Sequence, residues 1–238
     1  MAATATPRTS ERFCAPDADL TISSCDGVLF KVHRKNLEVH SDIFANAANA
    51  TRPENGDEIV PLEESSDVLD VLFQYMYRQP QPDLRVVEFP VFMGVAEAAE
   101  KYVVYSALPA IMIQIQEHIT QHPLQILNFA AKHDHKKLGN EAARLSVGLP
   151  MSDAATLLAP DTFKKWLVFY DNWHAGARRA LGDLFAGFQK DFHFRGDLVT
   201  RAHDPKTWYQ SWSPYASTRP SGDILAFLDV EFMPQAVA

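Results

Sequence analysis

DADLTISSCDGVLFKVHRKNLEVHSDIF, residues 17–44, is the stretch that indicates the fold class of this chain most clearly. Two short runs of alternating apolar residues, LTIS and VLFKV, flank an Asp26-Gly27 pair, which is a strong signal for a tight hairpin turn. After His33 the residues favour two short helical pieces, and Ser41 is a suitable N-cap for the second piece. The stretch therefore predicts a small hairpin that leads directly into helices.

One more short strand and a series of helices are expected after this stretch. In DEIVPLEES, Pro61 has no amide donor, which limits the predicted strand to a sheet edge or to a place where no amide is needed. Ser66 is expected to cap the next helix, and Pro123 stands at the first turn of a later one. Three glycines weaken the longest apolar segment, which begins at Asp161, because each costs about 1 kcal/mol inside a helix. The sequence therefore allows a kink or a break near Gly176.

The chain divides into three parts by the character of its residues. Residues 1–16 are small and polar and contain two prolines, so we expect a flexible lead-in, and they lack the apolar core of a signal peptide. Residues 17–121 combine the hairpin with helices and form the main domain. Residues 122–238 are expected to be a helical extension that ends in a loop rich in tryptophan and proline. The fold class is therefore α+β.

Composition argues against several functional classes. The chain has 238 residues, a net charge of −8 and no cluster of Lys and Arg that would form a basic face for nucleic acid. No run approaches the about 18 apolar residues that a membrane span needs. Cys14 and Cys25 form no Cys-x-x-Cys pair, which fits a reducing compartment. We expect a soluble intracellular protein, cytoplasmic or nuclear, that binds neither nucleic acid nor membrane.

The sequence contains no motif for catalysis or metal binding. It has neither Gly-x-Ser-x-Gly nor a glycine-rich phosphate loop, and no activated nucleophile beside a base. His133 and His135 are expected to lie at a helix start and to point to different faces, whereas zinc needs three or four converging ligands. We therefore expect no enzyme, no metal and no cofactor. A metal-dependent enzyme, or a thiol enzyme that uses Cys25, is kept as an alternative.

The order of the elements resembles the BTB/POZ domain family, in particular the BTB-only proteins of fungi. The matching segments are DADLTI (17–22), DGVLFKVHRKNL (26–37), HSDIF (40–44), IVPLEES (59–65), VLFQYMYRQ (71–79) and AAEKYVVYSALPAIM (98–112). The resemblance covers residues 17–121 and implies a BTB/POZ fold, with short strands and a helical bundle. The later helices are similar to the all-α extension that often follows such a domain.

The resemblance implies that the chain is a non-catalytic protein–protein interaction module. Many members self-associate, and many deliver substrates to a cullin-3 ubiquitin ligase. An adaptor for such a ligase is therefore one hypothesis. The alternative is a self-assembling scaffold with no ligase role. Both hypotheses make other proteins, and for the scaffold a second copy of the chain, the expected partners.

The resemblance also implies a candidate dimer pocket near the hairpin. Asp19 and Arg34 match the charged pocket of dimeric members, although the lead-in has no helix of the kind that such members exchange. Alternatively, Asp19 and Arg34 form a structural polar pair that caps the hairpin. His33 stands where the second strand meets the helix, and the family gives it a structural role rather than that of a ligand or a base.

A cullin-type face is implied in the segment after the second helical piece. Ala47 and Ala48 stand where bulky contact residues are common in adaptors. The triplet Arg52-Pro53-Glu54 matches an apolar-x-Glu motif, with Glu54 kept and Arg52 in place of the apolar anchor. Anchors of protein interfaces are usually aromatic or bulky side chains. The face therefore keeps the Glu of the adaptor motif but lacks its apolar anchor.

Four tryptophans suggest a second candidate site in the extension. Trp166 and Trp173 lie on the apolar stripe of the long helical segment, and Trp208 and Trp212 lie in the late loop. If the loop folds back onto the helix, these side chains form a core. If it does not, they form an aromatic groove that captures a peptide from a partner. The sequence leaves both interpretations open.

Overall fold

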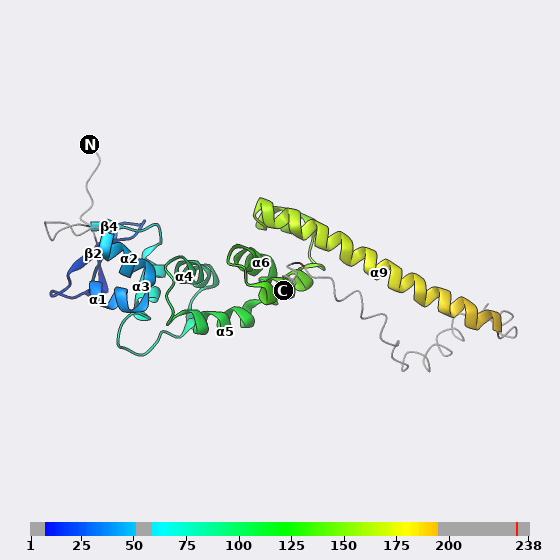
Figure 1. Ribbon diagram of the computed structural model, residues 1–238, viewed down its shortest axis with the longest axis horizontal. Helices are drawn as coiled ribbons and strands as arrows, with labels where there is room; N and C mark the ends of the chain where they lie inside the picture. The colour runs from blue at the N-terminus through cyan, green and yellow to red at the C-terminus, as the bar shows by residue number, and fades with distance from the viewer. Residues whose placement is uncertain (1–7, 51–58, 195–231, 233–238) are drawn as a thin grey trace. The chain divides into compact units, whose positions relative to one another are not determined.

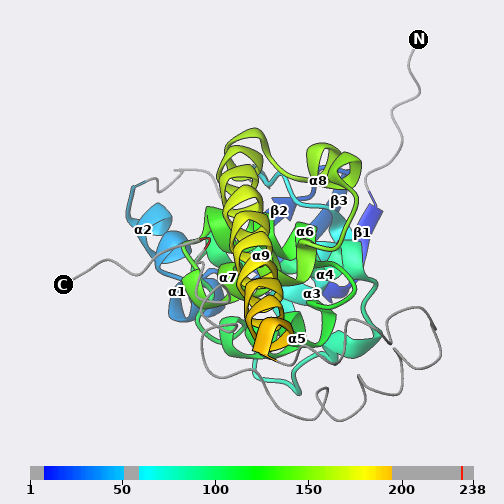
Figure 2. The same ribbon diagram turned by 90° about the vertical axis from the view of Figure 1, so that its right-hand side faces the viewer.

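The computed structural model describes residues 8–50, 59–194 and 232, with side chains described for 8–46, 59–179 and 232 (Figures 1 and 2). The chain divides into two compact units, Met1–Gln121 and His122–Ala238. They are called the N-terminal unit and the C-terminal unit below. The N-terminal unit mixes strands and helices and the helices continue through the C-terminal unit, so the α+β fold class is confirmed.

The N-terminal unit is built on a four-stranded sheet of order β1-β3-β2-β4. Its strands are β1 (Arg8–Cys14), β2 (Leu20–Ser23), β3 (Val28–Val32) and β4 (Ile59–Pro61). The antiparallel hairpin of β2 and β3 is confirmed, and Gly27 in its turn has φ +78°, a conformation that glycine adopts without strain. Of the two positions that the sequence allows for the strand with Pro61, the edge is the one observed, because among the described strands β4 pairs with β2 alone.

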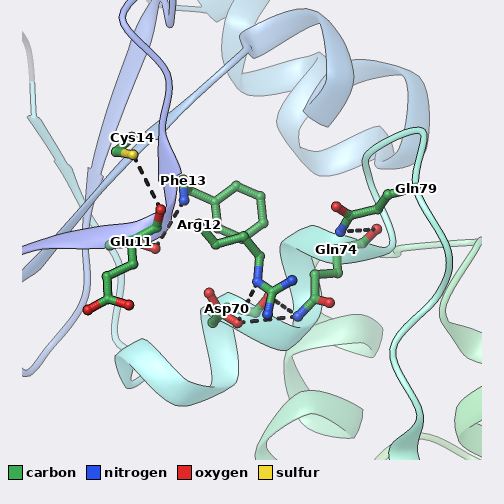
Figure 3. Close-up of polar contacts among 8 residues, drawn as sticks. Glu11, Arg12, Phe13, Cys14, Asp70, Gln74 and Gln79 are labelled. Carbon is green, nitrogen blue, oxygen red and sulfur yellow. Dashed lines mark hydrogen bonds and ion pairs between the residues drawn. The ribbon is translucent and has the colours of Figure 1, made fainter.

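The prediction of a flexible lead-in is wrong for residues 8–14, because they form β1. This strand runs parallel to β3 at the edge of the sheet (Figure 2). Phe13 is almost fully buried between the rings of Phe73 and Tyr77, with centroid distances of 5.6 and 5.3 Å. Figure 3 shows the neighbouring Arg12, whose Nε lies 3.2 Å from the Asp70 carboxylate on α3. One aromatic anchor thus orders a polar segment.

Helices cover the sheet and complete the N-terminal unit. They are α1 (Arg34–His40), α2 (Asp42–Ala50), α3 (Ser66–Gln74), the 3₁₀ helix η1 (Leu84–Val86), α4 (Phe89–Lys101) and α5 (Leu108–His118). The two helical pieces after the hairpin are confirmed, and Ser41 caps α2 by accepting the Phe44 amide at 3.2 Å. Ser66 does not cap α3: it lies in the first turn, and Ser65 is the N-cap residue.

A close approach of two helices stabilises this unit. A Cβ at Gly94 on α4 would meet Cγ2 of Val68 on α3 at 2.7 Å. Glycine is therefore needed where α4 crosses α3, and the two helices can bury their apolar faces together. Both helices supply fully buried core side chains; the large ones are Leu69, Leu72, Phe73 and Phe92.

The C-terminal unit is helical throughout its described part. It contains α6 (Pro123–Lys132), α7 (Lys136–Ser146), α8 (Met151–Leu157) and α9 (Pro160–Phe194). The helix start at Pro123 is confirmed. The break that the glycines allowed near Gly176 does not occur, since α9 is continuous and extends well past the other helices of this unit (Figure 1). A glycine costs only about 1 kcal/mol in a helix, and packing of the first turns of α9 offsets that cost.

Two polar anchors fix the start of α9. The Asn128 side chain on α6 donates to the Leu157 carbonyl at 2.6 Å and accepts the Ala159 amide at 2.9 Å, which holds the turn between α8 and α9. Trp166 is fully buried, and its indole N–H donates to the Ser146 hydroxyl on α7 at 2.8 Å. Polar groups that are buried in this way are satisfied, so the orientation of the early α9 turns is specified.

Candidate interaction surface

The residues of the expected dimer pocket meet through a backbone contact. The Arg34 amide at the start of α1 donates to the Asp19 carboxylate at 2.7 Å. No ion pair joins the two side chains in the part of the chain that the structure describes. A carboxylate that accepts an amide at a helix N-terminus satisfies a free donor and complements the helix dipole. The contact thus has the geometry that a structural polar pair requires.

His33 lies at the junction of β3 and α1, as the sequence predicts. Its amide donates to the Tyr77 hydroxyl at 2.8 Å, and its Nδ1 lies 3.1 Å from the same oxygen. On the other side of the ring, Nε2 is 3.4 Å from the Asp17 carboxylate. Burial raises the pKa of Tyr77, which keeps this hydroxyl protonated. His33 therefore joins the hairpin to the end of the α3 segment.

The hairpin turn is fixed to the start of α3 by Asp26. Its carboxylate accepts the Ser66 amide at 2.8 Å and the Ser66 hydroxyl at 2.6 Å. Burial acts to raise the pKa of Asp26, but hydrogen bonds from Ser66, Ser24 and backbone amides outweigh burial and lower the pKa to about 2. The charged form of Asp26 is therefore stabilised in the folded state.

Asp26→Asn should make the N-terminal unit less sensitive to acid. The folded-state pKa lies below the ordinary value of 3.8, so the stabilisation by Asp26 is complete above about pH 4 and is lost as the pH falls through about 2. Thermal unfolding between pH 2 and pH 5 measures this effect: the melting temperature of the variant should change less with pH than that of the wild type. Ser66→Ala should flatten the profile in part, and an unchanged profile in both variants would contradict the assignment.

The end of α1 and the start of α2 are held against the end of α4. The Ser41 hydroxyl between α1 and α2 donates to the Tyr102 carbonyl, and the Phe44 ring stacks on the Tyr102 ring with centroids 5.0 Å apart. After α4, the Tyr105 hydroxyl donates to the Asp42 carboxylate in the first turn of α2. These contacts connect segments that are far apart in the sequence and make this corner of the domain rigid.

Charged groups hold Tyr102 in turn. Its hydroxyl donates to the Glu64 carboxylate at 2.7 Å, and the Lys101 ammonium bridges Glu64 and Glu63 at 2.9 and 3.0 Å. Burial acts to raise the pKa of Glu64, but the Tyr102 hydroxyl and Lys101 lower it, so the carboxylate stays charged. The end of α4 is therefore tied to the loop between β4 and α3.

Three large apolar side chains are exposed on the segments that meet at this corner. Val39 on α1, Ile43 on α2 and Tyr105 after α4 are 64%, 43% and 54% exposed. They are called the α1–α2 edge below. Ile43 and Tyr105 lie in segments that resemble the family, yet the sequence alone did not single them out. The contacts of Tyr105 with Asp42 and of Tyr102 with Ser41 and Phe44 bring the two segments together.

The residues expected for the cullin-type face are described only in part. Ala47 and Ala48 lie in α2, with Ala47 one helical turn after Ile43. Arg52, Pro53 and Glu54 lie outside the described residues.

The expected aromatic groove is not assembled among the described tryptophans. Trp166 lies in the core, and Trp173 is half-buried and packs on Phe169, with ring centroids 5.9 Å apart. Trp208 and Trp212 lie outside the described residues.

The expectation that His133 and His135 point to different faces is wrong. They flank a turn between α6 and α7, where Asp134 has φ +57°, and both rings pack on Phe129 with centroid distances of 4.9 and 5.5 Å. The described residues contain no group of three or more His, Cys, Asp or Glu placed to hold a metal ion. In the same part of the chain, none of the helices has the length and apolar character that a membrane span needs.

A comparison with protein families identifies the N-terminal unit. The model of the BTB/POZ domain matches residues 9–118, so the match starts inside β1 and ends with α5. No curated protein matches the chain. The matched region contains the hairpin, the α1–α2 edge and the contacts of His33 described above. Residues 9–118 are therefore a BTB/POZ domain, a family of protein–protein interaction modules.

Proposed function

We propose that this chain is a non-catalytic adaptor whose BTB/POZ domain binds the N-terminal region of a cullin-3 ligase scaffold through the α1–α2 edge. The observation that carries the proposal is the exposure of Val39, Ile43 and Tyr105 on a rigid corner of the domain. Bulky apolar side chains that remain exposed often mark a surface that a partner covers. Family membership supplies the expectation that the partner is a protein.

Rigidity of the edge favours binding. Ser41, Phe44 and Tyr102 fix α2 against the end of α4, and the Tyr105 hydroxyl is held by Asp42. A surface that is ordered before binding loses less conformational entropy when the partner docks. The α1–α2 edge therefore presents its apolar side chains in one arrangement.

The edge also supplies anchors that the expected triplet lacks. Arg52 stands where adaptors carry an apolar anchor, and Ala47 and Ala48 are small. Ile43 and Tyr105 are bulky and exposed, as anchors of an interface must be before the partner binds. We assign the anchoring role to Ile43 and Tyr105, with Glu54 as an additional polar contact.

Ile43→Asp should weaken binding of a cullin-3 N-terminal fragment by at least about tenfold, because a charge replaces an apolar anchor at the interface. Titration calorimetry with the full chain measures the dissociation constant. The matched control is Ile113→Asp on α5, since Ile113 is 70% exposed and lies outside the edge. Glu54→Arg should weaken binding less than Ile43→Asp does.

Two results would contradict the adaptor proposal. In the first, wild type and Ile43→Asp bind the fragment equally, which places binding elsewhere. In the second, neither binds while the wild-type chain forms a defined oligomer, which favours the self-assembling scaffold.

A further inference from the structure

Phe232, close to the C-terminal end of the chain, packs on an early turn of α9. Its ring meets the Phe169 ring edge-on, with centroids 6.1 Å apart and an interplanar angle of 87°. Phe232 is 7% exposed and Phe169 is 3% exposed, so both rings are buried. Edge-to-face pairs of this kind add stabilisation to the burial of the rings themselves. A residue distant in the sequence thus covers this part of α9.

The receiving face of α9 differs from the face that packs on α7. Trp166 and Tyr170 lie along one row, with tilted rings whose centroids are 4.9 Å apart, and the indole N–H of Trp166 donates a hydrogen bond to Ser146 of α7. Phe169 and Trp173 form a second row, one helical turn apart, and their rings are 5.9 Å apart. Three residues turn a helix by about 300°, so the second row lies about 60° around the axis from the first.

We infer that the Phe169–Trp173 face is a docking site for a phenylalanine in a short acidic peptide, and that the C-terminal segment of this same chain occupies it through Phe232. The sequence around Phe232 fits this role. Asp229 and Glu231 precede it in LDVEFMPQAVA, residues 228–238, and the exposed Lys165 lies one turn before Phe169 on α9. Opposite charges beside an aromatic anchor favour docking in one orientation.

This site is separate from the proposed adaptor function. It lies in the C-terminal unit, whereas the BTB/POZ domain match ends at residue 118. Failure of the cullin experiment therefore leaves this inference intact, and the reverse also holds.

The test uses the full chain with Phe232→Ala, which vacates the site, and a labelled peptide of residues 228–238. Fluorescence anisotropy should show that this variant binds the peptide at least about tenfold more tightly than wild type, whose own segment occupies the site. The peptide with alanine in place of its phenylalanine should bind at least about tenfold more weakly. Phe227→Ala is the matched control, and its chain should behave as wild type.

Equal binding of the peptide by wild type and Phe232→Ala, or binding by neither, would overturn the inference. A second measurement needs no variant: the wild-type chain should give a nuclear Overhauser contact between the Phe169 and Phe232 ring protons. Absence of this contact, or its loss on dilution, would overturn docking within one chain.

Discussion

Trp166→Ala should lower the free energy of unfolding of the C-terminal unit by about 3–5 kcal/mol, the range for truncation of a large buried aromatic side chain. Trp166 is fully buried, and the centroid of its ring lies 4.9 Å from that of the Tyr170 ring. Its indole N–H donates a hydrogen bond to the Ser146 hydroxyl. The substitution leaves a cavity at the contact between α7 and α9. It also removes the polar anchor that orients the long helix.

Urea denaturation followed by tryptophan fluorescence measures this loss. The four tryptophans of the chain all lie in the C-terminal unit, so the signal reports that unit alone. Leu167→Ala is the matched control: this neighbour is partly exposed and its loss should cost less than about 1 kcal/mol. The loss of unfolding free energy caused by Ser146→Ala should lie between these two values, at about 1–3 kcal/mol, because the substitution leaves the buried indole N–H unpaired. Equal effects at Trp166 and Leu167 would contradict the described packing of α9.

Phe13→Ala should destabilise the N-terminal unit by about 3–5 kcal/mol. The Phe13 ring is buried among Phe30, Phe73 and Tyr77, at centroid distances of 6.1, 5.6 and 5.3 Å. It is the main apolar contact that holds β1 to the domain, so its loss should also expose the edge of β3. Native-state hydrogen exchange of the β2 and β3 amides measures the local free energy of opening.

Arg12→Ala provides the comparison within the same strand. The Arg12–Asp70 ion pair is largely exposed, and such pairs contribute less than about 1 kcal/mol (Figure 3). A small effect of both substitutions would mean that β1 is not an integral part of the domain. A large effect of Arg12→Ala alone would assign the stabilisation to the ion pair instead.

Local signals explain which elements could be predicted from the sequence. Local residue identity determines three of them: the Asp26-Gly27 turn, the Ser41 cap and the edge strand with Pro61. The β1 strand was missed because its buried residues, Ser10 and Phe13, are three positions apart and match no strand period. The pairing with β3 is irregular between Thr9 and Cys14, and this irregularity removes the alternation that would have indicated a strand.

The candidate sites needed tertiary structure. Tyr105 joins the α1–α2 edge through contacts between distant positions, such as the hydrogen bond of its hydroxyl to Asp42, 63 positions earlier. Phe232 had no helical or strand pattern around it that pointed to Phe169. By contrast, the resemblance in residues 17–121 was sufficient to predict the BTB/POZ domain, because its hairpin and following helices carry strong local signals.

The most direct test of the adaptor account is the molar mass of the wild-type chain by light scattering after gel filtration, alone and with a cullin-3 N-terminal fragment. The account predicts a complex whose mass exceeds that of the chain alone by one fragment for each chain. Separate elution of the chain and the fragment, each with its own mass at micromolar concentration, would contradict it.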